Sequence, residues 1–127
     1  MFIILNLILF YYIVMNTIKH LFYQLEEKYK IGVKFYFKDL SQIEFNHEKV
    51  CGGCTLLIER LIKNKKERRI TIYIDKKSHL IHSPEYILIH EYTHAILIYK
   101  CNNASHDVIF INLMKKLLKE FNIPDVV

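Results

Sequence analysis

The spacing of apolar residues divides the chain into helical and extended segments. Between Thr17 and Lys30, apolar residues recur at the three- and four-residue intervals of an amphipathic helix; they are Ile18, Leu21, Phe22, Leu25 and Tyr29. Gly32 follows at the usual position of a helix stop. From Val33 to Lys38 apolar and polar residues alternate, which predicts a half-buried strand.

Two further runs of β-forming residues predict a hairpin. Residues 55–62 and 70–75 each have the composition of a strand. The charged run Lys63–Arg69 separates them, and we expect it at the hairpin tip. Residues 39–53 are mixed in polarity and predict a loop, which ends in the sequence Cys51-Gly52-Gly53-Cys54.

The C-terminal third of the chain carries the signals of two helices. Ser83 suits an N-cap and Pro84 the first helical position, so we predict a helix from there to about Tyr99. Ser105 is expected to cap a last helix over residues 106–121. The order predicts an α+β fold, in which the helices pack on one face of a small three-stranded sheet.

Residues 1–15 differ from the rest of the chain. They read MFIILNLILFYYIVM, where Asn6 is the only polar interruption apart from the tyrosine hydroxyls. The run is shorter than the roughly 18–20 residues that span a bilayer, and it lacks the marks of a secretory signal. Three interpretations stay open: a membrane anchor formed by Met1–Val14, an element packed on the core, or a translated extension ahead of a start at Met15.

Composition limits the remaining 16–127 segment to a single domain. The chain has 127 residues, of which 52% are hydrophobic and 24% charged, so a packed core is expected. Three cysteines do not make a disulfide framework, and they favour a reducing compartment, cytoplasmic or nuclear-like. The roles of Cys51, Cys54 and Cys101 stay open, as does the oligomeric state.

The most specific chemical signal is His90-Glu91-Tyr92-Thr93-His94, an H-E-x-x-H pattern inside the predicted helix. Residues four apart on a helix lie on the same face, so the two imidazoles can bind one Zn²⁺ ion at about 2.0–2.1 Å. Glu91 lies beside that face and can accept a proton from a zinc-activated water without binding the metal. We therefore predict His90 and His94 as metal ligands and Glu91 as the catalytic base.

A catalytic zinc needs a third protein ligand. His106 is the best candidate, because it opens the helix that follows a short turn after the motif helix. Glu120 is a weaker candidate near the end of that last helix, and Asp107 could orient a ligand or substitute for one. Tyr86, Tyr92 and Tyr99 are candidates for stabilising an oxyanion, and nothing in the sequence selects among them.

These motifs resemble a known family. The combination HEYTHA, then Ser105-His106-Asp107 with Phe110 four residues after the histidine, is similar to the SprT-like metalloprotease domain of the Spartan proteins. The resemblance covers about residues 17–121. It implies a zinc-dependent peptidase with a protein or peptide substrate, His90, His94 and His106 as ligands, and a link to proteins bound or crosslinked to DNA.

The basic hairpin tip is the candidate contact with DNA or RNA. The side chains concerned are Lys63, Lys65, Lys66, Arg68 and Arg69, and the formal net charge of +5 permits such a partner. A run of this kind is more often a solvated turn. The alternative to a peptidase is therefore a non-catalytic, zinc-containing module that binds nucleic acid, although an intact Glu91 favours the enzyme.

Overall fold

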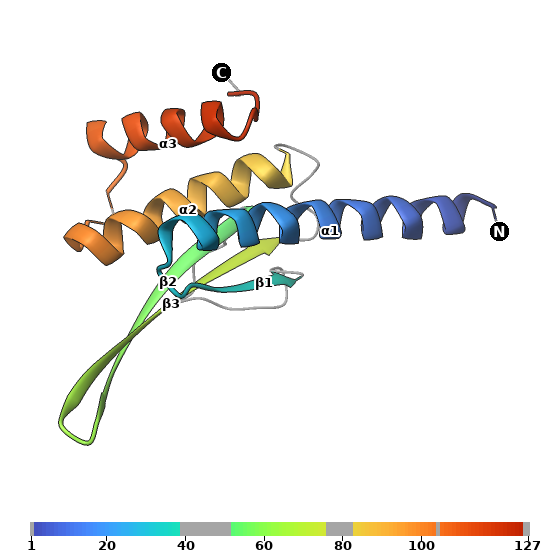
Figure 1. Cartoon of the computed structure of the whole chain (residues 1–127). Helices are drawn as coiled ribbons and strands as arrows, with labels where there is room; N and C mark the ends of the chain where they lie inside the picture. Colours follow the sequence, from blue (N-terminus) through green and yellow to red (C-terminus); the bar gives the residue numbers. More distant parts are fainter. Residues whose placement is uncertain (1, 39–51, 76–82, 104, 126–127) are drawn as a thin grey trace.

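A computed structural model describes residues 2–38, 52–75, 83–103 and 105–125 of the chain. Its elements, in order, are α1 (Phe2–Tyr29), β1 (Lys34–Lys38), β2 (Gly53–Ile62), β3 (Lys65–Asp75), α2 (Pro84–Cys101) and α3 (Val108–Glu120). Figure 1 shows α1 and α2 running over the sheet and α3 lying beyond α2. The α+β fold predicted from the sequence is confirmed.

The sheet is mixed, with the strand order β1-β3-β2. β1 pairs in parallel with β3, and β2 pairs with β3 in antiparallel register, so that Thr55 lies opposite Ile72. Ile70, Ile72 and Ile74 of β3 point into the core, where each is at most 5% exposed. The central strand therefore supplies the apolar floor on which α2 packs.

Helix α2 is the most deeply buried element. Every residue from Glu91 to Ile98 is buried, because the sheet lies below this helix, α1 beside it and α3 above it. Ser83 caps it as predicted: the Ser83 hydroxyl accepts a hydrogen bond from the Tyr86 amide at 3.2 Å. Asn102 ends it in the left-handed conformation, with φ of 53°.

Glu26 connects α1 to two other elements. Its Oε2 accepts hydrogen bonds from the amides of Gly32 and Val33, at 3.0 and 3.2 Å, which fixes the turn into β1. Its Oε1 accepts a hydrogen bond from the Tyr92 hydroxyl at 2.7 Å. The C-terminal half of α1 is thus attached to the motif helix by polar contacts as well as by the packing of Leu25.

The structure corrects two boundaries predicted from the sequence. The hairpin turn is only Lys63-Asn64, and residues 65–69 belong to β3, so the ribbon extends well beyond the helices (Figure 1). Cross-strand pairs such as Lys66 with Glu59, 2.8 Å apart, stabilise this extension despite its charge. The run that we expected at a hairpin tip is therefore mostly strand.

The last helix begins two residues later than predicted, at Val108, and Asp107 rather than Ser105 is its N-cap. The Asp107 carboxylate accepts a hydrogen bond from the Phe110 amide at 3.0 Å. The Ser105 amide and hydroxyl bond to the Asn103 side chain instead, at 3.0 and 2.8 Å. His106 consequently lies in the turn ahead of the helix.

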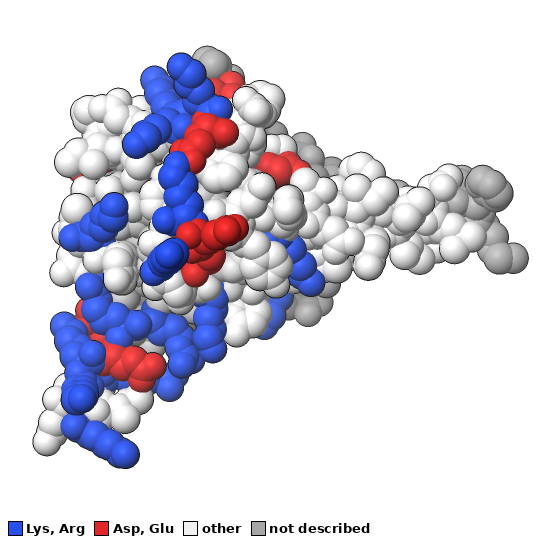
Figure 2. All heavy atoms as spheres, in the orientation of Figure 1, with Lys and Arg blue, Asp and Glu red and all other residues white. Residues whose placement is uncertain are grey.

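The first helix also differs from the sequence prediction, because α1 continues without a break from residue 2 through residues 17–29. The described side chains between Ile4 and Ile13 are exposed and do not pack on the core. In Figure 2 this part of α1 projects as an uncharged arm, whereas basic side chains gather over the hairpin.

Replacing Leu25 by Ala is expected to destabilise the domain by about 2–5 kcal/mol, because Leu25 is fully buried and its removal leaves a cavity between α1 and α2. Gln24→Ala changes an exposed neighbour on the same helix and should alter stability by less than about 0.5 kcal/mol. Urea denaturation of both variants measures the difference. Equal stabilities would mean that α1 is not part of the core.

Candidate metal centre

Three histidine side chains converge beside α2. His90 and His94 lie one turn apart on that helix, and His106 reaches back to them from the turn before α3. The Nε2 atom of His106 lies 2.9 Å from that of His94 and 3.2 Å from that of His90. A tetrahedral ion bound at about 2.05 Å would separate any two ligand nitrogens by about 3.3 Å. The three nitrogens are therefore spaced to hold one metal ion, and they are predicted correctly as a group.

The turn between α2 and α3 gives His106 its position. Asn102 leaves α2 in the left-handed conformation, and the Asn103 side chain donates a hydrogen bond to Asp107 Oδ2 at 3.0 Å. These contacts fix the backbone on both sides of His106, which lies ahead of the first residue of α3. Its imidazole is directed towards His90 and His94 of α2.

Phe110 packs against all three imidazoles. The centroid of its ring lies 5.0 Å from that of His90, 4.4 Å from His94 and 4.9 Å from His106, and the side chain is only 2% exposed. The sequence marks Phe110 only as part of a helical stripe and of the family motif. In the structure the Phe110 ring also limits the orientation of the three imidazoles, because it packs against each of them.

Burial sets the protonation of His94. Removal from water, together with the neighbouring His90 and His106, lowers the pKa of its imidazole to about 4. The ring is consequently neutral at pH 7. A neutral imidazole is the form that binds a metal ion.

Glu91 lies on the sheet side of the same cluster. Its side chain is 6% exposed, and Thr55 Oγ1 lies 3.0 Å from its Oε1 and 2.9 Å from its backbone oxygen. Burial raises the pKa of Glu91 to about 7, and the hydrogen bond from Thr55 partly opposes this shift. A carboxylate with this pKa can both accept and release a proton near neutral pH.

Gly53 allows β2 to approach α2 closely. A Cβ atom at this position would lie 2.9 Å from Ile87 Cγ2, 2.9 Å from the Tyr73 oxygen and 3.2 Å from Glu91 Cγ. Sequence reasoning missed the roles of Gly53 and Thr55, because both depend on which strand lies next to the motif. The paired glycines at 52–53 were the available signal.

The cluster opens into a cavity of about 300 Å³, so an ion held by the three imidazoles would have a fourth position open to solvent. The cavity is lined by β2, α2 and the turn before α3. Its lining residues are Gly53, Cys54, Thr55, His90, Glu91, His94, Ile98 and His106. The three imidazoles and the Glu91 carboxylate therefore border the same open space.

Several other candidates lie elsewhere. Glu120 pairs with Lys28 at the end of α1 and is not near the cluster. Asp107 caps α3. None of the three candidate tyrosines lines the cavity: Tyr92 donates to Glu26, Tyr86 borders a different hollow beside α3, and Tyr99 is 53% exposed.

The cysteines show no second metal group among the described residues. Cys54 borders the cavity from β2, whereas Cys101 is exposed at the end of α2, and both are free thiols. Burial, together with the charge of Glu91, raises the pKa of Cys54 to about 11, so its thiol is protonated at neutral pH. Cys51, which completes the CxxC pattern, lies outside the described residues.

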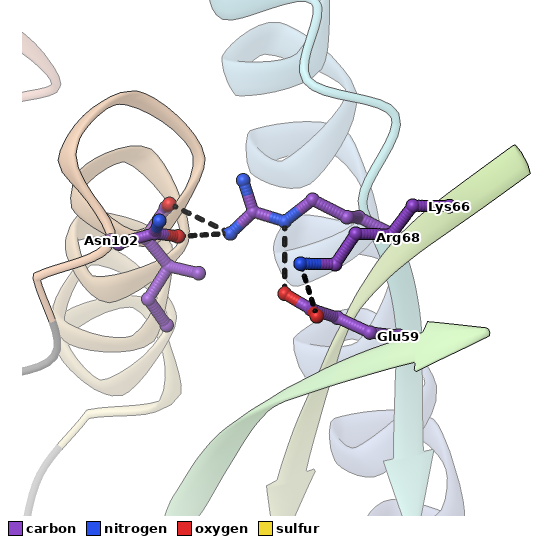
Figure 3. Close-up of polar contacts among 5 residues, drawn as sticks. Glu59, Lys66, Arg68 and Asn102 are labelled. Atoms are coloured by element: carbon purple, nitrogen blue, oxygen red, sulfur yellow. Dashed lines mark hydrogen bonds and ion pairs between the residues drawn. The ribbon is translucent and has the colours of Figure 1, made fainter. Parts of the chain in front are cut away.

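Much of the basic charge on the hairpin is paired within the protein. Figure 3 shows Lys66 and Arg68 both directed at the carboxylate of Glu59. The nitrogen–oxygen distances of these two ion pairs are 2.8 and 3.5 Å respectively. Arg68 also donates to the Ile98 oxygen and to the Asn102 side chain, which ties the hairpin to the end of α2. The other predicted contacts, Lys63, Lys65 and Arg69, lie along the exposed part of the ribbon, and Arg69 pairs with Glu67.

Replacing His106 by Ala should remove most of the bound metal. Two imidazoles bind a divalent ion much more weakly than three, so near-stoichiometric metal in the parent should fall to a small fraction after dialysis. Elemental analysis of the purified protein measures this content. His20→Ala is the control, because His20 is an exposed residue of α1. Equal metal content in the parent and the His106 variant would exclude His106 as a ligand.

Glu91→Gln should stabilise the metal-free protein at alkaline pH. With a pKa near 7 when folded and near 4.5 when unfolded, Glu91 binds more protons in the folded state between those values. The wild-type protein therefore loses stability as pH rises through this window, by about 3 kcal/mol at pH 8, and Gln does not.

Urea denaturation in the presence of a chelator at pH 5 and pH 8 measures this difference. The advantage of the variant should be large at pH 8 and small at pH 5. An advantage of equal size at both pH values would show that ionisation of Glu91 is not its cause.

Comparisons with known proteins give no family assignment. The chain matches no protein-family model, and no curated protein and no solved structure matches it. What the site does must therefore be argued from its own geometry.

Proposed function

We propose that the protein is a zinc-dependent metallopeptidase that hydrolyses peptide bonds with an activated water. One observation carries the proposal: three imidazole nitrogens and the carboxylate of Glu91 border the same open cavity. Three imidazole ligands with one position left to solvent are typical of a catalytic rather than a structural zinc site. The resemblance of the motifs to SprT-like domains supports the same activity.

Zinc is the proposed metal because of the donor set. Imidazole ligands suit zinc, copper, iron and nickel, whereas magnesium and calcium prefer oxygen ligands. Zinc has no redox chemistry and accepts the tetrahedral spacing found here. When bound, zinc lowers the pKa of a coordinated water and polarises the substrate carbonyl.

Glu91 is the proposed general base. It follows the first ligand directly in the chain, borders the cavity and has no positively charged partner among the described contacts. Its carboxylate can take a proton from the attacking water and deliver it to the leaving amine. Thr55 holds this carboxylate in place by hydrogen bonding, so that one lone-pair direction is fixed.

Strand β2 favours a peptide as the substrate. It is an edge strand of the sheet, and its first residues, Gly53, Cys54 and Thr55, line the cavity. Its outer edge has no partner strand within the described segments. An extended peptide can add to such an edge by main-chain hydrogen bonds, which would bring one of its peptide bonds to the metal.

The non-catalytic, nucleic-acid-binding alternative has less support. Lys66 and Arg68 are engaged with Glu59, which reduces the charge that they offer to phosphate. A module without activity also gives no reason for a buried, unneutralised carboxylate at Glu91. A DNA-associated protein substrate remains part of the proposal only through the family resemblance and the exposed Lys63 and Lys65.

Glu91→Gln should abolish hydrolysis while the metal stays bound. Removing a general base lowers kcat by roughly 10²–10⁴-fold, and the amide leaves the three imidazoles intact. The measurement is cleavage of fluorescein-labelled casein by zinc-loaded protein, together with the zinc content of each sample.

Glu85→Gln provides the matched control, because it makes the same chemical change in the first turn of α2, away from the cavity. It should retain the parental rate. Hydrolysis by the Glu91 variant at the rate of this control would contradict the assignment of the base.

A further inference from the structure

Helix α1 changes character along its length. From Ile18 onwards it is amphipathic, with one side in the core and the other towards water. Val14 is partly buried against the core, but the described apolar side chains from Ile4 to Ile13 are all largely exposed. They are Ile4, Leu5, Ile8, Leu9, Phe10, Tyr12 and Ile13, each between 53% and 63% exposed.

These exposed side chains do not form a single stripe. At about 100° per residue, they spread over roughly 240° of the helix circumference. In the sequence, the remaining positions from 2 to 14 are also apolar apart from Asn6. A helix that is apolar on all sides needs an apolar environment on all sides, which water and a single protein groove do not provide.

The length of the apolar part suits a lipid bilayer. No charged residue occurs before Lys19, and the part of the helix before Val14, residues 2–13, extends for about 18 Å. The hydrocarbon core is about 30 Å thick, so a helix of this length can insert through more than half of it. By length and composition, Ile4–Tyr29 is a candidate membrane span, and only 12% of its most apolar window is buried.

We infer that the part of α1 before Val14, residues 2–13, inserts into the hydrocarbon of a lipid bilayer and holds the domain at its surface. The uninterrupted helix favours this arrangement, because the same rod enters the core at Ile18 without a flexible joint. Lys19 and His20 are exposed at the boundary, where the headgroups would lie. A second copy of the chain would cover one side of the helix and leave the others in water.

This anchor would also fix the distance between the candidate metal centre and the membrane surface. Glu26 of α1 bonds to Tyr92, which lies within the His90–His94 motif. Glu26 follows Ile18 by eight residues, or about 12 Å along the helix axis. The metal centre would therefore act close to the membrane surface. The anchor itself does not depend on the proposed peptidase activity.

Flotation of the full-length protein with phosphatidylcholine vesicles on a density gradient tests the anchor. The parent should float with these uncharged vesicles, and 1 M NaCl should not release it, because apolar insertion is not screened by salt. Ile8→Asp places a charge in the middle of the inserted segment and should lower the ratio of bound to free protein by roughly 100-fold. Ile8 is exposed, so this variant should keep the circular dichroism and melting of the parent.

Tyr23→Asp is the matched control, because Tyr23 is also an exposed apolar residue of α1 but lies beside the core, at 66% exposure. It should float like the parent. Three results would overturn the inference: equal flotation of both variants, binding only to anionic vesicles with release by salt, or a discrete oligomer in solution that does not float.

Discussion

One turn of α2 that contains buried polar side chains constrains the rest of the structure. Four consecutive residues, Glu91–His94, are buried, and each polar group needs a partner because water cannot reach it freely. The Glu91 carboxylate accepts a hydrogen bond from Thr55 on β2, and the Tyr92 hydroxyl donates one to Glu26 on α1. The His94 imidazole lies 2.9 Å from that of His106, which precedes α3. One turn of helix therefore determines where three other elements lie.

This arrangement combines stability and chemistry in the same contacts. The Glu91 carboxylate has little solvent contact and no cationic partner among the described residues, so its charge destabilises the metal-free fold at neutral pH. Its raised pKa is nevertheless what a proton acceptor needs. Burial likewise keeps the His94 imidazole neutral, which is the form that binds a metal ion. Phe110 then limits the motion of the three imidazoles from the apolar side. The fold alone therefore places the three imidazoles close together and limits their orientation.

Local patterns predicted the parts of the structure that depend on local physics. The Ser83 cap, the start of α2 at Pro84 and the four-residue spacing of His90 and His94 are properties of a single helix, and all are confirmed. The start of α3 was predicted two residues too early, because Ser105 and Asp107 can both cap and only tertiary contacts decide between them. Thr55 could not be predicted as a partner of Glu91, because their contact depends on the register of a non-local sheet.

The central claim is that three imidazoles bind one ion. X-ray absorption at the zinc edge of the zinc-loaded protein measures the ligands directly. The structure predicts three imidazole nitrogens and one further light atom, at about 2.0–2.1 Å, with multiple-scattering features from the rings. Sulfur scatterers at about 2.3 Å, or fewer than three imidazoles, would contradict the claim and would point to Cys54 or another thiol instead.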